Sequence, residues 1–495
     1  MAKRNRAWEL NFRSYNTKDI QGTLGALLGM ASEHARVMRQ FPRLREVEAQ
    51  HMATQDIARR MTIRGLSVVQ SERTALQRLV KTRLTKATRA FQAVAGDILP
   101  TQTERVAKLL YETLGAEPPH YTKGSEQLKV DGVVLLSEHP DWVGPRGEEV
   151  GGSEESIEES SEERPQGSTD AAALAVLVDD QNPTVRAVAE ALLRCRAQQK
   201  LLSTYITPLL GKLRVHPSWR NTGAVTGRWS CSSPNLMNQP DEMRIMYSAR
   251  PGYVLVSRDY SQLEMRETAY FTSCAWLLGA LNEKDAHTKL ACELYGIGAS
   301  ELTKDRRDLW KCYWYARTYG AGVDKRLSMI QNFQHDDGTY PFKSITRQEI
   351  MAFDARLAKF APELEVWNRR LFAQVEKDGF YESTLSGRVH WFNNGMDYTR
   401  VVNNPNQEGA AAVINAAMVR LDGRLRKTFP KDFKDDLQTP FVLQIHDELV
   451  AEAPERNAER YSLIMKEEME REVVVAGRRV VFPTDVKINE SWAKV

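Results

Sequence analysis

Two aspartates in this chain follow runs whose composition is typical of β-strands. Residues 253–258 lead to Asp259 and residues 440–446 lead to Asp447, and both runs are rich in alternating, β-branched side chains. Mg²⁺ binds hard oxygen ligands, and one or two carboxylates complete each ion's shell together with water and substrate phosphates. Two such ions about 3.5–4 Å apart can activate an attacking hydroxyl and stabilise a leaving oxygen. Both aspartates are therefore candidate metal ligands, although either one alone is explained as well by a turn-capping role.

A second pattern combines cations and aromatic rings at four-residue spacing. If the segment is a helix, four side chains lie on one drifting face: Arg307, Lys311, Tyr315 and Tyr319. The cations on such a face can hold a triphosphate while the tyrosines pack against a sugar and a base. Gly320 follows directly and leaves room for a base or a backbone to approach closely. An ordinary aromatic core stripe with charged margins explains the same spacing without any function.

The elements that must position these residues form a mostly helical first part and a mixed second part. Apolar residues recur every three or four positions in residues 1–135 and 171–205, which predicts helices. Between these parts, residues 144–168 are rich in Glu, Gly and Ser, a composition expected to be disordered. A long helical region from about residue 274 to 375 separates the two predicted strands.

Composition excludes several classes of protein. The five cysteines show no Cys-x-x-Cys spacing, so neither a disulfide framework nor a zinc site is indicated, and a reducing compartment fits. No apolar run approaches the roughly 18 residues of a membrane span, and the basic N-terminus lacks the apolar core of a signal peptide. Residues 1–90 contain 18 Lys and Arg against 7 Asp and Glu, which suits a polyanionic partner or an ordinary solvated helical face.

In their order along the chain and in their amino-acid residues, these segments resemble the motifs of the family A DNA polymerases. Asp259-Tyr-Ser-Gln-Leu-Glu264-Met-Arg266 resembles motif A of that family, residues 307–320 resemble motif B, and His446-Asp447-Glu448 resembles motif C. Flanking segments resemble further family motifs: residues 200–205, 226–228 with 234–238, 285–288, 387–388 and 403–407. The resemblance covers residues 50–495 apart from the acidic segment, and the order of the motifs makes it specific.

The resemblance implies an α+β fold, the right-hand polymerase fold, with an antiparallel-sheet palm, helical fingers, a helical thumb and a helical N-terminal segment. It implies these domains: a remnant of a 3′–5′ exonuclease domain at 1–45, a helical segment at 46–92, the thumb at 93–215, the palm at 216–275 and 395–495, and the fingers at 276–394. An acidic insertion at about 124–167 interrupts the thumb. It would repel DNA phosphates, so we expect it either to bind a basic partner, such as a processivity factor, or to have no binding role.

The resemblance also assigns the reaction centre. Asp259 and Asp447, with the backbone carbonyl of Tyr260, would bind two Mg²⁺ ions, which Mn²⁺ can replace. Glu448 joins the catalytic set. Lys311 is a candidate proton donor to the departing pyrophosphate.

Two further groups of residues are assigned to substrates in the same way. The incoming deoxynucleoside triphosphate would contact Arg307, Lys311, Tyr315, Tyr319, His287, Glu264, Gln262 and Tyr260. Among these, Glu264 would block a ribose 2′-hydroxyl and Tyr319 would lie near the templating base. The minor groove of the primer–template DNA would be contacted by Arg228, Asn235, Asn238, Arg388, Gln407 and His446. Acceptors there occupy similar places in every correct base pair, so donors can check pair geometry without reading sequence.

The implied activity is template-directed DNA synthesis, in which the primer 3′-hydroxyl attacks the α-phosphate of a deoxynucleotide and pyrophosphate leaves. A single-subunit RNA polymerase is one alternative; Glu264 argues against it, as does Glu448 at a position where such enzymes usually have Ser. A catalytically silent DNA-binding paralogue is the other, and the retained Asp259, Asp447 and Arg307 argue against that. We expect the protein in the cytoplasm of a bacterium or phage-infected cell, without a membrane partner.

No 3′–5′ exonuclease activity is expected of this chain. Family members with that activity have an Asp-x-Glu strand and further metal-binding aspartates upstream, the last in a Tyr-x-x-x-Asp helix. Only Tyr15 and Asp19 resemble this pattern here. Three interpretations stay open: decay of the domain, a separate exonuclease chain that docks on residues 1 to about 45, or an ordinary N-terminal helix. A separate exonuclease is therefore a candidate partner.

Overall fold

The computed structural model describes the following residues: 34–119, 121, 167–283, 285–333, 340–392, 397–433, 435 and 437–493. The predictions about Tyr15 and Asp19 lie outside these residues, as do those about residues 122–166 of the acidic insertion. The chain divides into two compact units, Gln70–Leu210 and the rest, Met1–Val69 with Gly211–Val495.

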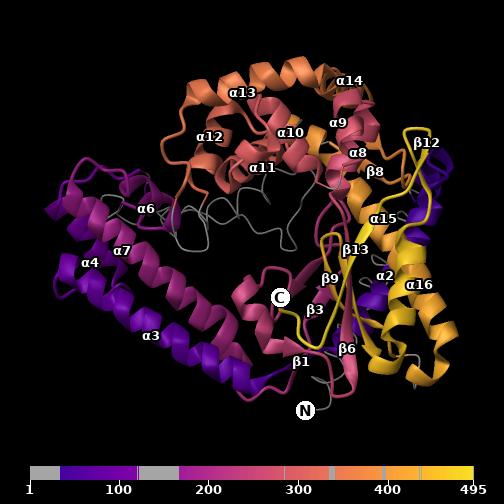
Figure 1. Ribbon diagram of the computed structural model, residues 1–495, viewed down its shortest axis with the longest axis horizontal. Helices are drawn as coiled ribbons and strands as arrows, with labels where there is room; N and C mark the ends of the chain where they lie inside the picture. Colours follow the sequence, from indigo (N-terminus) through magenta and orange to yellow (C-terminus); the bar gives the residue numbers. More distant parts are fainter. Residues whose placement is uncertain are drawn as a thin grey trace, which may run out of the picture. The chain divides into compact units, whose positions relative to one another are not determined.

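The larger unit is built on a four-stranded antiparallel sheet with the strand order β13–β6–β10–β9 (Figure 1). Its strands are β6 (Tyr253–Tyr260), β9 (Phe441–Ile445), β10 (Glu448–Pro454) and β13 (Thr484–Asn489). The two predicted strands are thus present, but β9 ends at Ile445 and does not reach Asp447. The chain turns there because Glu448 of β10 pairs with Ile445, which leaves a two-residue loop between the strands.

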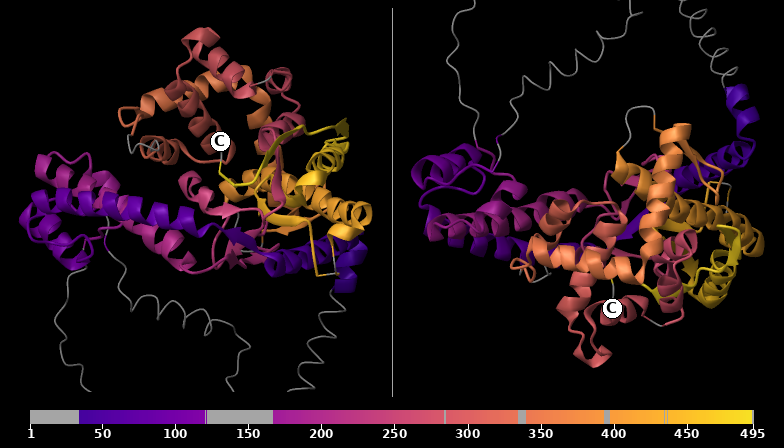
Figure 2. Two further views of the ribbon diagram at one scale, coloured as in Figure 1. Left: turned by 60° about the horizontal axis from the view of Figure 1, so that its bottom comes forward. Right: turned by 90° about the horizontal axis from the view of Figure 1, so that it is seen from above.

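Helices pack around the sheet, which buries β9 and most of β10 and leaves β13 largely exposed. The helices are α2 (Leu44–Arg64), α8 (Leu263–Thr272), α15 (Tyr398–Thr428) and α16 (Ala458–Met469). α16 packs on β6, β10 and β13, whereas α15 packs against α2, α8 and α16 (Figure 1, Figure 2). The sequence of α15 is rich in Ala, Val and Gly on all sides, which suits a helix enclosed by other elements.

Ion pairs hold α2 to its neighbours. Arg64 at the end of α2 lies 2.8 Å from Glu452 of β10, and Arg250 reaches the same carboxylate at 2.8 Å. Arg60 lies 2.8 Å from Asp422 of α15. Because both carboxylates are buried, removing a partner would leave a charge in the protein interior.

A second helical cluster of the larger unit follows α8. It contains α9 (Ala275–Ala280), α10 (Ala286–Tyr295), α11 (Lys304–Thr318), α12 (Val323–Gln331), α13 (Arg347–Phe360) and α14 (Pro362–Asp378). Its core contains Trp310, Tyr313 and Trp314 from α11. Thr303 caps the start of α11 by accepting from the Arg306 N–H at 3.3 Å, and such a cap satisfies a free amide of the first turn.

The unit Gln70–Leu210 is helical. It contains α3 (Gln70–Ala95), α4 (Thr103–Ala107), η1 (Lys108–Thr113), α6 (Ala171–Leu177), α7 (Pro183–Lys200), η2 (Leu201–Ile206) and η3 (Thr207–Leu209). α3 and α7 pack against each other around Phe91 and Leu192. α3 is one continuous helix across residue 93, where the sequence analysis places the start of the thumb.

Short elements complete the larger unit. The strands are β1 (Leu66–Val68), β2 (Arg214–Val215), β3 (Ser218–Arg220), β4 (Ser230–Ser232), β5 (Tyr247–Ser248), β7 (Phe380–Glu382), β8 (Val389–Trp391), β11 (Val473–Val475) and β12 (Arg478–Val480). The 3₁₀ turns are η4 (Asp241–Met246), η5 (Ala299–Glu301), η6 (Pro430–Asp432) and η7 (Glu455–Asn457). Among the helices that the structure describes, none combines the length and the apolar character that crossing a membrane requires.

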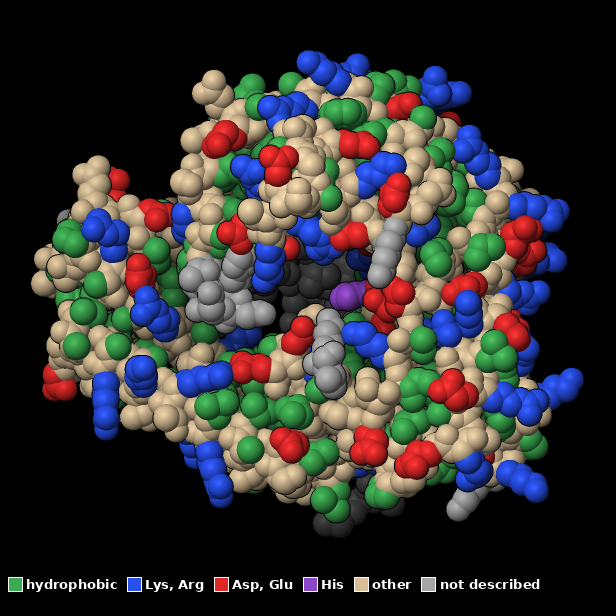
Figure 3. Space-filling view, viewed as in Figure 1, with side chains coloured by type: hydrophobic (Ala, Val, Ile, Leu, Met, Phe, Trp, Pro, Cys, Tyr) green, Lys and Arg blue, Asp and Glu red, His purple; other side chains and the backbone are tan. Residues whose placement is uncertain are grey.

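Basic side chains line the edge of the larger unit at β12 and α16 (Figure 3). Several of them are paired with acids: Arg424 lies 2.9 Å from Glu468, and Arg479 lies 3.1 Å from Glu472. The positive charge of this edge is therefore partly neutralised. A polyanion would bind it less strongly than the number of basic side chains alone indicates.

Candidate active site

The end of the central sheet gathers acidic side chains from several strands. Asp259 on β6 lies opposite Glu448 on β10 and opposite Asp485 on β13. Asp447 occupies the loop between β9 and β10, and its carbonyl accepts from the Tyr260 N–H at 3.2 Å. Strand pairing thus brings together Asp259 and Asp447, which their separation in sequence could not show.

The carboxyl groups of Asp259 and Asp447 are hydrogen-bonded to each other. Burial raises the pKa of Asp447 and the neighbouring Glu448 adds to this, while Arg228 and the hydrogen bond with Asp259 act in the opposite direction. Two carboxyls can share a hydrogen bond only when one of them carries a proton. A cation between them would take the place of that proton.

This donor set fits Mg²⁺. Mg²⁺ typically binds through one or two carboxylates plus water and phosphate oxygens. Within the described parts of the chain, no group of three or more His, Cys, Asp or Glu side chains is arranged to hold a metal by itself. The residues present would thus supply a part of each metal shell and leave the rest to substrate and water.

Two residues beside the aspartates adopt left-handed backbone conformations. His446 precedes Asp447 with φ 54°, and Gln262 precedes α8 with φ 55°. Such conformations are uncommon for residues other than Gly and are found at functional sites more often than elsewhere. The tight loop at His446 is what presents Asp447 at the end of the sheet.

Helix α11 separates its core residues from the predicted nucleotide-binding face. Trp310 and Trp314 are buried, whereas Arg307, Lys311 and Tyr315 are half-buried. The cations and aromatic rings at four-residue spacing therefore do not form the buried face of the helix. A buried face was the simpler interpretation of the sequence. Tyr319 directly follows α11 and is also half-buried.

Arg307 is held by the start of α10. Its Nη2 and Nε donate to Asp285 at 2.7 and 3.1 Å, and Nε also lies 3.1 Å from the Thr288 hydroxyl oxygen. Asp285 in turn caps α10 by accepting from the Thr288 backbone N–H at 3.1 Å. Although burial alone would raise it, the hydrogen bonds from Thr288 and Arg307 lower the pKa of Asp285.

Positive charge is crowded next to Arg307. Burial and the charge of Arg307 lower the pKa of Lys311. Burial and the charges of Lys311 and Arg307 lower the pKa of His287 to about 4. Since Nε2 of His287 lies 3.4 Å from the Tyr315 hydroxyl, four of the eight predicted nucleotide contacts meet in one place: Arg307, Lys311, His287 and Tyr315. An anion bound there would relieve the repulsion.

Glu264 lies between Arg228 and Tyr319. Nη2 of Arg228 donates to one carboxylate oxygen and the Tyr319 hydroxyl donates to the other. From the sequence, Glu264 is assigned to the sugar, Arg228 to the DNA and Tyr319 to the templating base. The structure joins them into one cluster in which the carboxylate of Glu264 is fixed from both sides.

The remaining predicted site residues are placed less tightly. Asn235, Asn238 and His446 are exposed, and Gln407 is half-buried on α15. Arg388 lies against Gly227, where an added Cβ would be 3.1 Å from the guanidinium. These predicted DNA contacts stay predictions.

Tyr260 contributes its backbone to the site. Its side chain is buried and its hydroxyl donates to the Met469 carbonyl at 2.7 Å. The predicted nucleotide and metal contacts of this residue are thus restricted to its main chain.

Sequence reasoning missed several charged residues near the site. Asp285 lies in the flanking motif at residues 285–288, but its sequence indicated no role for it. No role was predicted for Asp485 either. Glu267 and Glu408 are buried completely, with 0% and 1% of their surface exposed. The only sequence signal for this pair is a charged residue inside an otherwise small or apolar helical stretch.

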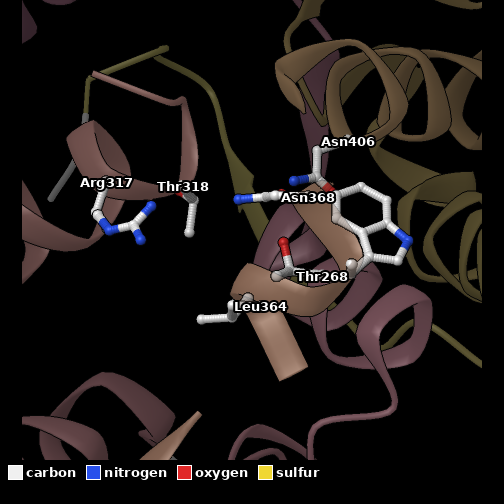
Figure 4. Close-up of a pocket in the computed structure, with 7 residues that line it drawn as sticks. Thr268, Arg317, Thr318, Leu364, Asn368 and Asn406 are labelled. Carbon is white, nitrogen blue, oxygen red and sulfur yellow. The ribbon is translucent and has the colours of Figure 1, made fainter. Parts of the chain in front are cut away.

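A small pocket lies where α8, α11, α14 and α15 meet (Figure 4). Its lining residues are Thr268, Arg317, Thr318, Leu364, Trp367, Asn368 and Asn406. The cavity is about 10 Å³, which is close to the smallest space that holds one water. The carbonyl oxygen of the Asn406 side chain is buried and has no hydrogen-bond partner among the described residues, so a water there would satisfy it.

Comparison with known proteins bears out the resemblance of the sequence motifs. A model of DNA polymerase family A matches residues 153–494. The thermostable DNA polymerase I of Thermus thermophilus is 29% identical over 326 residues, which are 62% of this chain and 36% of that protein. DNA polymerase I of Caldicellulosiruptor bescii is 28% identical over 346 residues, or 66% of this chain and 37% of that protein. The chain thus spans little more than a third of the length of these relatives.

A solved structure supports the fold. The POL domain of Pol1 from M. smegmatis, in complex with a DNA primer-template and dNTP, matches with a TM-score of 0.70 at 21% identity. The match covers 92% of this chain and 72% of that one. It confirms the predicted α+β polymerase fold. Because the family model matches more than half of its residues, the chain belongs to DNA polymerase family A.

Proposed function

We propose that this protein is a DNA-directed DNA polymerase that adds deoxynucleotides to a primer 3′-hydroxyl by two-metal phosphoryl transfer and releases pyrophosphate. The observation that carries the proposal is the contact between Asp259 and Asp447 at the end of the palm sheet. Membership of the family and the crowded positive charge of α11 support it.

Asp259 and Asp447 would hold two Mg²⁺ ions, with the Tyr260 carbonyl as a further ligand. When bound, Mg²⁺ supplies positive charge beside the attacking hydroxyl and the leaving phosphate oxygens. Because burial raises the pKa of Asp447, a proton bound there would leave when a metal ion binds, so metal binding and proton release would be coupled. Glu448 accepts a hydrogen bond from the Ser257 hydroxyl and so has a fixed orientation beside them.

The triphosphate of the nucleotide would bind at Arg307, Lys311 and His287. Arg307 uses Nε and Nη2 for Asp285, which leaves Nη1 for phosphate. Lys311 has a lowered pKa and is therefore a stronger acid than an ordinary lysine. This suits it to donate a proton to the departing pyrophosphate.

Selection of deoxyribose would rest on Glu264. Arg228 and Tyr319 hold its carboxylate from both sides. A ribose 2′-hydroxyl would have to displace this cluster, which costs hydrogen bonds that a deoxyribose leaves intact.

Primer–template DNA would be the macromolecular partner. Donors on the minor-groove side would come from Arg228, Asn235, Asn238, Arg388, Gln407 and His446. We further propose that a separate exonuclease or processivity factor is a candidate partner.

Primer extension with labelled nucleotides tests the proposal. With Mg²⁺ and deoxynucleotides, we expect a primer to be lengthened as directed by its template. Lengthening by ribonucleotides in preference to deoxynucleotides would indicate an RNA polymerase. Tight DNA binding without extension by either would indicate a silent paralogue.

A further inference from the structure

The contact between α8 and α15 buries two glutamates that the proposed mechanism does not use. Glu267 of α8 is 0% exposed and Glu408 of α15 is 1% exposed. A Cβ added at Gly409 would lie 2.7 Å from Oε1 and 3.1 Å from Oε2 of Glu267. The carboxyl of Glu267 therefore rests directly on the α15 backbone, next in sequence to Glu408, and only glycine leaves room for it.

The two carboxyls have unequal partners. Oε1 of Glu408 accepts from the Ser386 hydroxyl, and Ser383 and the charges of Arg388 and Arg43 also favour its ionised form. Oε2 of Glu408 is buried and has no hydrogen-bond partner among the described residues.

Glu267 has far weaker support for a negative charge. Neither of its oxygens has a partner with regular hydrogen-bond geometry in the described part of the chain, and only the backbone N–H of Ala410 comes near enough to favour its anion. Burial and the neighbouring Glu408 raise the pKa of Glu267 well above its ordinary value, against the smaller effect of Arg228. A buried carboxylate without donors takes up a proton rather than bear the desolvation cost.

Charged and titratable groups face the pair from several elements. Those near Glu267 are Glu408, Arg228, Asp447 and Tyr260. Those near Glu408 are Arg388, Arg43 and Tyr381. Ionisation of both glutamates would therefore add a negative charge beside Arg228, which already pairs with Glu264, and beside Asp447.

We propose that Glu267 carries a proton in the folded protein and that this neutral carboxyl, seated on the α15 backbone at Gly409, is a positioning device that fixes α15 against α8. Gln407 precedes Glu408 on α15, and Glu264 lies one turn before Glu267 on α8. The pair thus sets the spacing between a DNA contact and the sugar-selecting residue, a role that rests on the proposed function. The protonation of Glu267 does not rest on it.

The proton gives the pair a definite dependence on pH. Because the folded protein holds Glu267 protonated, its stability is greatest at low pH. It declines as pH rises from the unfolded-state pKa of about 4.3 towards the higher folded-state value. Loss of the proton places a second anion in the interface and loosens α15 from α8. Glu267→Gln keeps the shape and neutrality of the protonated acid and removes this decline.

Infrared spectroscopy of the free, full-length protein tests the proton directly. At about pH 7.5, ordinary carboxyls with a pKa of about 4.3 are ionised, so a C=O stretch of a protonated carboxylic acid reports an exceptional group. With Mg²⁺ present, we expect this band in the wild type and its loss in Glu267→Gln.

Two matched variants serve as controls. We expect the band to persist in Glu452→Gln, which changes an equally buried glutamate that has arginine partners, and in Asp447→Asn, which removes another carboxyl whose pKa is raised. The proposal is overturned if the wild type has no band, if Glu267→Gln keeps it, or if it arises only after treatment with a chelator. The last outcome would mean that a cation, not a proton, joins the pair.

The positioning role is tested by primer–template affinity and its pH dependence. Glu267→Ala is expected to raise the Kd for primer–template by about tenfold, because it removes the buried side chain that spaces α8 from α15. Glu267→Gln is expected to raise it by much less. The ratio of the wild-type extension rate to the Glu267→Gln extension rate should be constant at low pH. It should fall at the pH at which the infrared band of the wild type disappears. The positioning role would be refuted if both variants lost primer–template affinity equally, or if the ratio of extension rates stayed constant through the pH at which the band disappears. Either result would leave the polymerase assignment intact.

Discussion

Replacement of Gly320 by Ala should destabilise the larger unit strongly. Gly320 joins the end of α11 to the chain that follows, with φ +78°. An added Cβ would lie 2.7 Å from Cγ2 of Val402 and 3.1 Å from Cα of Thr399, both on α15. The left-handed conformation costs Ala about 1–2 kcal/mol, and overpacking against α15 costs about 1–3 kcal/mol. The expected loss is therefore about 2–5 kcal/mol.

A neighbouring glycine provides the matched control for this prediction. Gly322 has an ordinary φ of −64° and nothing within 4 Å of an added Cβ, so Gly322→Ala should cost about 1 kcal/mol or less. Urea unfolding followed by tryptophan fluorescence measures both variants, since Trp310 and Trp314 of α11 lie in the core. If Gly320→Ala and Gly322→Ala unfold at the same urea concentration, the close approach of α11 and α15 does not limit this position.

Three other substitutions have defined outcomes. Glu264→Ala should relax the exclusion of ribonucleotides by about ten- to two-hundred-fold, measured as the ratio of kcat/KM values for the two sugars. Tyr315→Phe should reduce acceptance of dideoxynucleotides by about tenfold in competition assays, because its hydroxyl can replace the missing 3′-hydroxyl; equal acceptance by both proteins would contradict this. Glu452→Gln should lower the free energy of unfolding by about 3–5 kcal/mol, because buried Arg64 and its neighbour Arg250 lose their carboxylate.

Periodicity in the sequence predicted the elements and one face of the site. The four-residue spacing of α11 left a core stripe open as an alternative, and the structure instead buries Trp310 and Trp314 while Arg307 and Lys311 stay half-buried. The run before Asp259 was correctly predicted as a strand. The run before Asp447 was predicted one residue too long at each end. Its C-terminal end was missed because the hairpin loop depends on pairing between β9 and β10, which local composition does not contain.

Contacts between distant segments could not be predicted from the residues alone. Asp259 and Asp447 meet through strand order, and the cluster of Arg228, Glu264 and Tyr319 joins a loop and the ends of two helices. The pair Glu267 and Glu408 was missed for a related reason. A glutamate in a helix is normally solvated, and its burial becomes visible only when another helix is packed on it.

The central claim is that Asp259 and Asp447 hold the metal ions of DNA synthesis. Single-turnover primer extension at saturating Mg²⁺, with primer–template affinity measured in parallel, tests it most directly. We predict that Asp259→Asn and Asp447→Asn each abolish extension while the Kd for primer–template stays close to that of the wild type. Extension by either variant at a substantial fraction of the wild-type rate would contradict the assignment.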